Sequence, residues 1–430
     1  MSVFAAALTT APSAPSDSST LLLLVAAAMV LLMTPGLAFF YGGMVQSKSV
    51  INMMMMSFGA IALVSVLWIV YGYSMSFGVS GDGGRVTDWV IPHVLLDPFA
   101  NIGLHDYLPL HADGTMSAMN AGDAHSLAFV IFEATFAIIT VALISGAIAD
   151  RAKFGSWMIF AGLWVTIVYF PVASWVFSDG GWLKNLGLHD FAGGTVIEVS
   201  SGAAALGLAL ALGRRIGFTK GMVKPHNVPL TLIGAALLWF GWFGFNGGSA
   251  GAVNTTAALA WVNTLAAPAA ATVGWLITEK LKEGKPTSIG AASGAVSGLV
   301  AITPSADTLT PLWALAVGLA AGVLCCLAIE LKWRFGFDDT LDVVGIHLVG
   351  GLVGTLSIGF VGAGIGLLDT GSFVQLGVQA LGVIAVGAYS FAIAYGGGLL
   401  LQKTIGFRIT SEDESAGVDT IVHGEESYAI

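Results

Sequence analysis

Length, composition and charge exclude most classes of soluble protein. The chain has 430 residues, of which 56% are hydrophobic and only 10% are charged, whereas a typical soluble domain carries roughly 25% charged residues. These few charges cannot cover a soluble surface of this size, which excludes a cytosolic enzyme, a nucleic-acid-binding protein and a disordered chain. The composition indicates a protein whose main solvent is lipid. The 57 glycines suit closely packed transmembrane helices.

Long runs without charge predict eleven transmembrane helices. A spanning helix needs about 20 apolar residues, and the runs place spans near residues 20–40, 53–77, 126–148, 156–177, 191–212, 228–246, 254–279, 287–304, 311–331, 341–361 and 376–402. The spans are too long for the strands of a β-barrel. We therefore predict an all-α polytopic membrane protein, with residues 1–19 as an external tail or leader, 20–403 as the transmembrane domain and 404–430 as a cytoplasmic tail.

The basic residues predict the orientation of these spans. Lysine and arginine concentrate in cytoplasmic loops of membrane proteins. If the N-terminus is outside, all of the 16 basic residues except Arg85 and Lys184 fall on the cytoplasmic side. We therefore predict a multi-pass plasma-membrane protein with its N-terminus outside and its C-terminus in the cytoplasm.

A few ionisable residues remain inside the predicted spans. Burying such a group in lipid costs ~2.5–3.5 kcal/mol on insertion scales, so these positions indicate function. They are Glu133, Glu198 and His347, with Asp190 and Asp339 near span ends. An aspartate precedes both Glu198 and His347 by eight residues, which corresponds to about 12 Å of helix. Each spacing takes an interfacial aspartate to a group near the middle of the bilayer.

The matched aspartates belong to a wider internal similarity. They lie in the fifth and tenth spans, and the first and sixth spans share aromatic residues followed by a glycine pair, at 39–43 and 243–248. Because each half holds an odd number of helices, the halves insert in opposite directions. This pattern indicates an inverted five-helix repeat plus an extra C-terminal helix, with the functional site between the halves.

This repeat predicts that Glu198 and His347 face one another across a narrow pore. A carboxylate and an imidazole can share or pass a proton, which suits a substrate that sheds and regains one. The alternative is a buried polar pair that only holds two helices together.

Aromatic residues near the outer span ends predict a cation site. An aromatic face attracts a cation through its quadrupole, and a hydroxyl four residues after Phe245 adds an acceptor, Ser249. The aromatic residues are Phe132, Phe136, Phe177, Trp182, Trp242 and Phe245. An aromatic belt at the membrane interface is the alternative reading. No metal-ligand spacing is present in the sequence, and we expect neither a metal nor a cofactor.

Five motifs carry a resemblance to a known family. They are Pro35–Gly43, Asp190–Thr195, Gly241–Gly251, Asp342–His347 and the tail stretch Gly417–Glu425. On these motifs the chain resembles the ammonium transporter family (Amt, Mep and Rh proteins) over nearly its full length. The resemblance implies an eleven-helix protomer, a homotrimer and one pore per protomer. It also implies ammonium or its analogue methylammonium as substrate, and a PII-type regulatory protein as a cytoplasmic partner.

The resemblance also implies roles for single residues. Phe136 and Phe245 resemble the stacked phenylalanine gate, and Ser249 resembles the hydroxyl of the outer recruitment site. Asp190 resembles the required acid near that site, and His347 resembles the second member of a pore histidine pair.

Two positions depart from the commonest family pattern. Glu198 stands where the first histidine of the pair is expected, as in some fungal Mep members, and Phe177 stands where a tryptophan is expected. The replacement of tryptophan should weaken capture of a cation modestly.

A transport mechanism follows as a hypothesis. Ammonium collects against Phe177, Trp242 and Ser249, loses a proton near Asp190 and the gate, and crosses as ammonia while the proton moves along Glu198 and the paired imidazole. The alternatives are an ammonium sensor with little flux and a Rh-like ammonia gas channel. We expect no enzymatic activity, because the sequence holds no convincing catalytic motif.

Overall fold

The computed structural model describes residues 16–78, 88–107, 121–220 and 224–428, and the side chains from residue 124 onward in the third of these ranges. Within these residues, eleven helices are long and apolar enough to cross a membrane. Each overlaps one of the eleven predicted spans, and the prediction of an all-α membrane protein is confirmed. Residues 1–15 of the expected N-terminal tail lie outside the described residues.

The spans are built from long helices, some of them interrupted by turns of a different helical type. In chain order they are α1 (Asp17–Met44), α2 and α3 (Val50–Leu67, Tyr73–Phe77), α4 (Ala121–Ile144), α5 and α6 (Phe154–Trp164, Phe170–Val176), α8 (Ser200–Leu212), α9 (Val228–Gly248), α10 (Thr255–Glu283), α11 (Ser288–Ile302), α12 and α13 (Pro311–Ala328, Leu331–Phe335), α14 (Val349–Val361) and α16 (Val374–Thr404). Turns of π-helix (Trp68–Gly72, Val165–Tyr169, Gly194–Val199, Val344–Leu348) join α2 to α3 and α5 to α6, and begin the spans of α8 and α14. Short 3-10 turns (Ser145–Ile148, Thr303–Ser305) extend α4 and α11.

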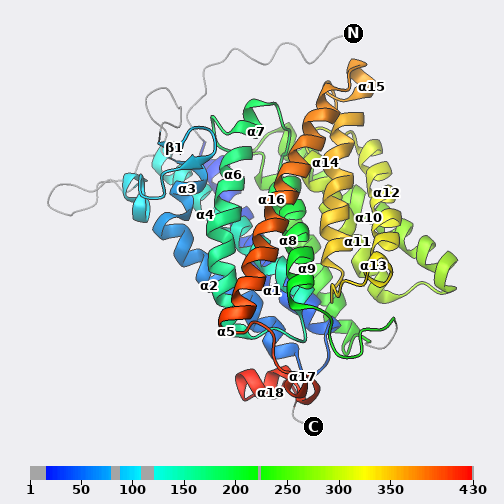
Figure 1. The fold of residues 1–430 in the computed structure, drawn as a ribbon. Helices are drawn as coiled ribbons and strands as arrows, with labels where there is room; N and C mark the ends of the chain where they lie inside the picture. Colours follow the sequence, from blue (N-terminus) through cyan, green and yellow to red (C-terminus); the bar gives the residue numbers. More distant parts are fainter. Residues whose placement is uncertain (1–15, 79–87, 108–120, 221–223, 429–430) are drawn as a thin grey trace.

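Shorter elements lie at the two ends of the bundle (Figure 1). We call the end where α1 begins the N face and the opposite end, which holds the C-terminal tail, the C face. The short elements are the antiparallel strands β1 (Trp89–Ile91) and β2 (Leu95–Leu96), a 3-10 turn (Ile102–Tyr107), α7 (Trp182–Asn185), α15 (Leu367–Thr370), α17 (Ser411–Ala416) and α18 (Val418–His423).

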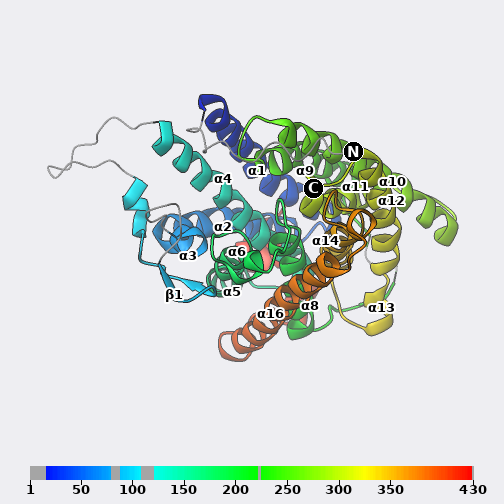
Figure 2. The same cartoon turned by 90° about the horizontal axis from the view of Figure 1, so that it is seen from above.

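Glycine allows a close crossing of two helices in the bundle. Helices α1 and α9 lie side by side, as the view along the spans shows (Figure 2). A Cβ atom at Gly234 would lie 2.2 Å from the backbone nitrogen of Phe40, and one at Gly43 would lie 2.6 Å from the carbonyl oxygen of Asn227. Small residues let the two backbones approach where hydrophobic driving force between helices is weak in lipid.

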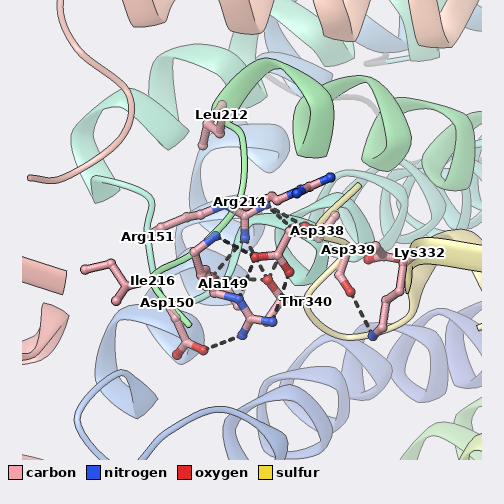
Figure 3. A network of polar contacts seen from close by, with 12 residues as sticks. Ala149, Asp150, Arg151, Leu212, Arg214, Ile216, Lys332, Asp338, Asp339 and Thr340 are labelled. Carbon is pink, nitrogen blue, oxygen red and sulfur yellow. Dashed lines mark hydrogen bonds and ion pairs between the residues drawn. The ribbon is translucent and has the colours of Figure 1, made fainter. Parts of the chain in front are cut away.

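A buried ionic network holds the C face together (Figure 3). The guanidinium of Arg151 donates to the Asp338 carbonyl at 2.6 Å and to the Thr340 hydroxyl at 2.7 Å. Arg215 donates to Asp338 through Nε at 2.9 Å and Nη2 at 3.0 Å, and to Asp150 at 2.8 Å. Burial alone would raise the pKa of Asp338, but these bonds outweigh it and lower the pKa. The network therefore fixes the loops that precede the fourth, sixth and tenth spans.

The C-terminal tail folds back over this face. Glu414 accepts a hydrogen bond from the backbone of Ile216 and pairs with Arg408 at 2.8 Å. Asp419 is buried and accepts the backbone N–H groups of Ile51 and Asn52, at 3.0 and 2.8 Å. Asp419 thereby caps the first turn of α2, where free N–H groups favour an anion.

Candidate functional site

A cavity opens on the N face between α4, α6 and the end of α9. Its volume is about 450 Å³, and its wall includes Phe136, Phe177 and Ser249 of the predicted site. The same wall carries Glu133, which makes no hydrogen bond or ion pair to another described residue. We call this cavity the N-face pocket. It combines aromatic faces, a hydroxyl and a carboxylate, which is a chemistry that suits a small cation.

Two phenylalanine rings close the bottom of the N-face pocket. The rings of Phe136 and Phe245 have centroids 4.4 Å apart and are tilted by 58°. Phe132 packs edge-on against Phe136 with centroids 4.7 Å apart. Phe136 lines the N-face pocket, whereas Phe245 lines a second cavity beyond it. The two predicted gate residues therefore stand in contact between two separate cavities.

The second cavity is small and its wall is almost wholly apolar. We call it the inner cavity. It has a volume of about 10 Å³, and Leu37, Leu143, Leu238 and Phe245 are among its apolar lining residues. A water molecule needs roughly 10–15 Å³ measured in this way, so the cavity has room for about one small molecule. Its two ionisable lining residues among those described are Glu198 and His347.

Glu198 and His347 form a buried hydrogen-bonded pair. The His347 Nδ1 and Glu198 Oε2 atoms are 2.6 Å apart, and the two side chains are 4% and 1% exposed. The other carboxylate oxygen, Glu198 Oε1, is buried and has no partner within the part of the chain that the structure describes. A carboxylate in contact with an imidazole can exchange a proton, and Oε1 remains available as an acceptor.

Both members of the pair lie in matching local structures. Glu198 lies in the π-helical turn Gly194–Val199, and His347 lies in the π-helical turn Val344–Leu348. Such turns are rare and occur often at functional sites. Each turn follows a buried aspartate, which supports the predicted relation between the two halves of the chain.

Asp190 is the aspartate that caps the first of these turns. Its Oδ1 accepts the N–H groups of Gly193 and Gly194 at 2.9 and 2.7 Å, and its Oδ2 accepts those of Thr195 and Val196 at 2.8 and 3.2 Å. Burial raises the pKa of Asp190, and these four hydrogen bonds oppose that rise.

This placement differs from the prediction that Asp190 binds the substrate. Asp190 is absent from the described lining residues of both the N-face pocket and the inner cavity. Its oxygens are already occupied by backbone N–H groups. Asp190 therefore positions Glu198 by holding the start of its helix.

Asp339 has the corresponding place before the second turn. Its Oδ2 accepts the Val344 N–H at 2.7 Å. Burial raises the pKa of Asp339 to about 6. The spacing of eight residues therefore leads from a cap to a member of the buried pair in both halves of the chain.

Trp242 also differs from its predicted place in the outer site. Its ring lies 5.2 Å from that of Phe245 and lines the inner cavity, and it is absent from the described lining of the N-face pocket. The indole Nε1 donates to the Thr303 hydroxyl at 2.8 Å. Trp242 is thus a wall of the inner cavity, one helical turn further from the N face than Phe245.

Glu133 is the site residue to which the sequence reasoning gave no role. The sequence marks it as an ionisable residue inside a span, and it precedes Phe136 by three positions. Residues three apart lie on neighbouring parts of one helix face. This relation to the predicted gate could have placed Glu133 in the N-face pocket.

The comparison with protein families identifies the family of the chain. The model of the Ammonium Transporter Family matches residues 21–428. The chain belongs to the ammonium transporter family. An ammonium transporter of Mycobacterium tuberculosis (strain H37Rv) is 50% identical over 416 residues, which cover 92% of this chain and 87% of that relative.

Solved structures of ammonium transporter family proteins share the fold. A protein described as "Sensor Amt Protein" matches with a TM-score of 0.85 and 31% identity, over 95% of this chain and 98% of that chain. Mep2 of Saccharomyces cerevisiae matches with a TM-score of 0.80 and 30% identity, over 94% of this chain and 92% of that chain. The Mycobacterium tuberculosis relative is named as an ammonium transporter, and the eleven spans make this family member a multi-pass membrane protein.

Proposed function

We propose that this protein takes up ammonium through a pore between the N-face pocket and the C face. The observation that carries the proposal is the order of three features along one path. A pocket with aromatic and carboxylate groups is followed by the Phe136–Phe245 contact, and then by an apolar cavity with a buried Glu198–His347 pair.

The N face is external in this proposal. The loops and tail at the C face hold most of the basic residues, and the positive-inside rule assigns such a face to the cytoplasm. Family membership and the eleven spans support a place in the plasma membrane. Ammonium then enters through the N-face pocket.

Ammonium is held in the N-face pocket by three kinds of group. The ring of Phe177 offers its negative face to the cation. The Ser249 hydroxyl donates its own proton to the Phe245 carbonyl at 2.8 Å, so its oxygen is left to accept an N–H of ammonium. The carboxyl group of Glu133 in the same wall offers a further oxygen that can accept an N–H of ammonium.

The gate and the inner cavity favour ammonia over any bare cation. An ion that loses its water shell without a partner is costly to bury. Ammonium avoids this cost by giving up a proton, whereas potassium has no proton to give. The Glu198–His347 pair receives the proton and passes it toward the C face, while ammonia crosses the apolar cavity.

A signalling role is the second candidate, and one comparison favours it. The solved structure described as a sensor Amt protein superposes with a TM-score of 0.85. A sensor would bind ammonium in the N-face pocket but conduct little of it. A neutral gas channel would conduct ammonia without moving charge.

Current from the purified protein in liposomes separates these functions. An ammonium pulse should produce an inward current, and Glu198→Gln should abolish most of it because the amide cannot carry the proton. Glu283→Gln, at the exposed end of α10, is the matched control and should keep the full current. An alkaline shift inside the liposomes without current would indicate a gas channel.

Two outcomes would contradict the proposal. Full current from Glu198→Gln at neutral pH would exclude the proton-relay role of the carboxylate. Absence of current, together with no ammonium-dependent growth of a transporter-deficient cell, would exclude uptake and favour the sensor.

The assembly and the regulatory partner are part of the same proposal. We propose a homotrimer, since α1 carries exposed apolar side chains such as Leu21 and Leu24 that a second copy could cover. We also propose that a PII-type protein binds the C face, where Arg214 and Lys224 lie in the loop before α9. Native mass spectrometry of the detergent-solubilised protein, with and without such a partner, tests both.

A further inference from the structure

A lysine ammonium group lies in the wall of the N-face pocket. Lys184, on α7, donates from Nζ to the Phe177 carbonyl at 2.8 Å and to Asp179 Oδ1 at 2.7 Å. Lys184, Asp179 and Phe177 all line the pocket together with Glu133. The side chains of Lys184 and Asp179 are 43% and 60% exposed. The pocket that attracts a cation therefore already contains one.

The position of the Lys184 ammonium group is set by Phe177, the residue proposed to bind ammonium. Lys184 holds the backbone carbonyl of Phe177, while Phe177 itself lines the pocket. The ammonium group of Lys184 therefore contacts the backbone of a residue that belongs to the proposed recruitment site. The Lys184 ammonium group and an ammonium ion bound in this pocket carry like charges. At the effective dielectric constant of a protein surface, their repulsion is large enough to measure.

Stability offers little reason for this ion pair. Exposed salt bridges contribute ~0–1 kcal/mol to folding, and both side chains are substantially exposed. Among the described lining residues, the pocket carries the carboxylates of Glu133 and Asp179 and the single fixed positive charge of Lys184. Removing Lys184 would leave two carboxylates facing an incoming cation.

We propose that Lys184 sets the affinity of the N-face pocket for ammonium. Its tethered ammonium group repels the free cation and neutralises Asp179, so the pocket binds its cargo more weakly than its aromatic and acidic groups alone would. Weak binding at an entry site favours onward passage, because conduction requires that the cargo can leave the site. This inference rests on the proposed function, since it names a residue that tunes the same recruitment site.

The test compares five variants of the full chain in liposomes. Lys184→Gln should lower the half-saturating concentration of methylammonium by about threefold to tenfold at low ionic strength. Lys184→Arg keeps the charge and should match the wild type. Asp179→Asn should raise the half-saturating concentration, and the double variant Asp179→Asn with Lys184→Gln should return close to the wild-type value. Lys285→Gln, in the loop after α10, is the charge-matched control distant from the pocket and should change nothing.

Ionic strength and direct binding complete the test. The difference between Lys184→Gln and wild type should shrink in salt, because salt screens exposed charges. An unchanged or raised half-saturating concentration in Lys184→Gln would overturn the proposal, since a purely structural ion pair predicts that direction. If the wild type carries no current, the proposed function fails separately. Binding is then measured as the methylammonium-dependent shift in melting temperature, which needs no flux, and an equal shift in wild type and Lys184→Gln would overturn the role of Lys184.

Discussion

Replacing Asp190 with asparagine tests whether this residue is a helix cap or a ligand of the cargo. Each carboxylate oxygen of Asp190 accepts two backbone N–H groups. Asparagine keeps one oxygen, and its amide group faces the remaining two N–H groups as a donor. Hydrogen bonds to charged groups contribute ~1.5–3 kcal/mol each, so two lost bonds amount to about 3–6 kcal/mol. Part of this loss is offset because the buried carboxylate no longer has to be desolvated, which leaves about 3 kcal/mol.

Thermal unfolding in detergent measures this loss. The melting temperature of Asp190→Asn should fall by several degrees, and transport should fall with it because the helix start no longer positions Glu198. The matched variant is Asp339→Asn, in which the Oδ2 that accepts the Val344 N–H can be retained as the amide oxygen, so its loss should be smaller. An unchanged melting temperature with abolished transport in Asp190→Asn would refute the capping role and restore Asp190 to the substrate path.

Three further predictions concern the faces of the bundle. Arg215→Lys loses the two-atom contact with Asp338 and should destabilise the protein by about 2–4 kcal/mol in thermal unfolding; an unchanged melting temperature would contradict this. Burial alone would lower the pKa of His189, but Asp307 outweighs it and raises the pKa, so their pairing should stabilise fully below about pH 6.5 and be lost as the pH rises through the raised pKa. His189→Gln should flatten this pH dependence of the melting temperature. Asp419→Asn removes a capping charge from α2 and should cost ~1 kcal/mol, seen as faster proteolysis of the tail than in wild type.

The helices and the buried pair follow from features that a sequence displays directly. Apolar length predicts a span because lipid cannot satisfy exposed backbone groups. Glu198 and His347 stand out because ionisable residues are rare inside spans, and the eight-residue spacing from Asp190 and Asp339 marks them as equivalent. The structure joins them at 2.6 Å. Spacing along the chain was sufficient here because both residues lie on regular elements that the repeat relates.

The direction of a side chain is less visible in the sequence. Trp242 precedes Phe245 by three residues on α9, so both lie on one face of the helix, about 4.5 Å apart along the axis. Ser249, which lines the N-face pocket, lies four residues beyond Phe245, so Trp242 is about two turns from that pocket and lines the inner cavity. Asp190 is an acid near a pore, but its oxygens turn back to the N–H groups of its own chain. Residue type alone cannot distinguish these orientations.

Contacts that depend on how a loop folds cannot be predicted from sequence patterns. Lys184 stands out in the sequence as one of two basic residues assigned to the external side, and its pairing with Asp179 spans five residues. Its contact with the Phe177 carbonyl arises because the chain turns at the end of α6 and begins α7. This turn places the Lys184 ammonium group in the wall of the N-face pocket. The pattern of charges along the sequence does not predict that position.

The two capped π-helical turns hold the backbone on both sides of the Glu198–His347 pair. The cap and the turn fix the backbone around position 198 through Asp190 and not through the side chain at that position. A carboxylate placed there needs only one oxygen to reach His347 Nδ1. The other oxygen, Oε1, is buried without a partner among the described residues, and Glu198 lines the cavity of about 10 Å³. In the proposed mechanism this oxygen supplies the hydrogen-bond acceptor that ammonia, a donor, lacks elsewhere in an apolar cavity. In that mechanism Glu198 both shares in carrying the proton and offers ammonia a resting point.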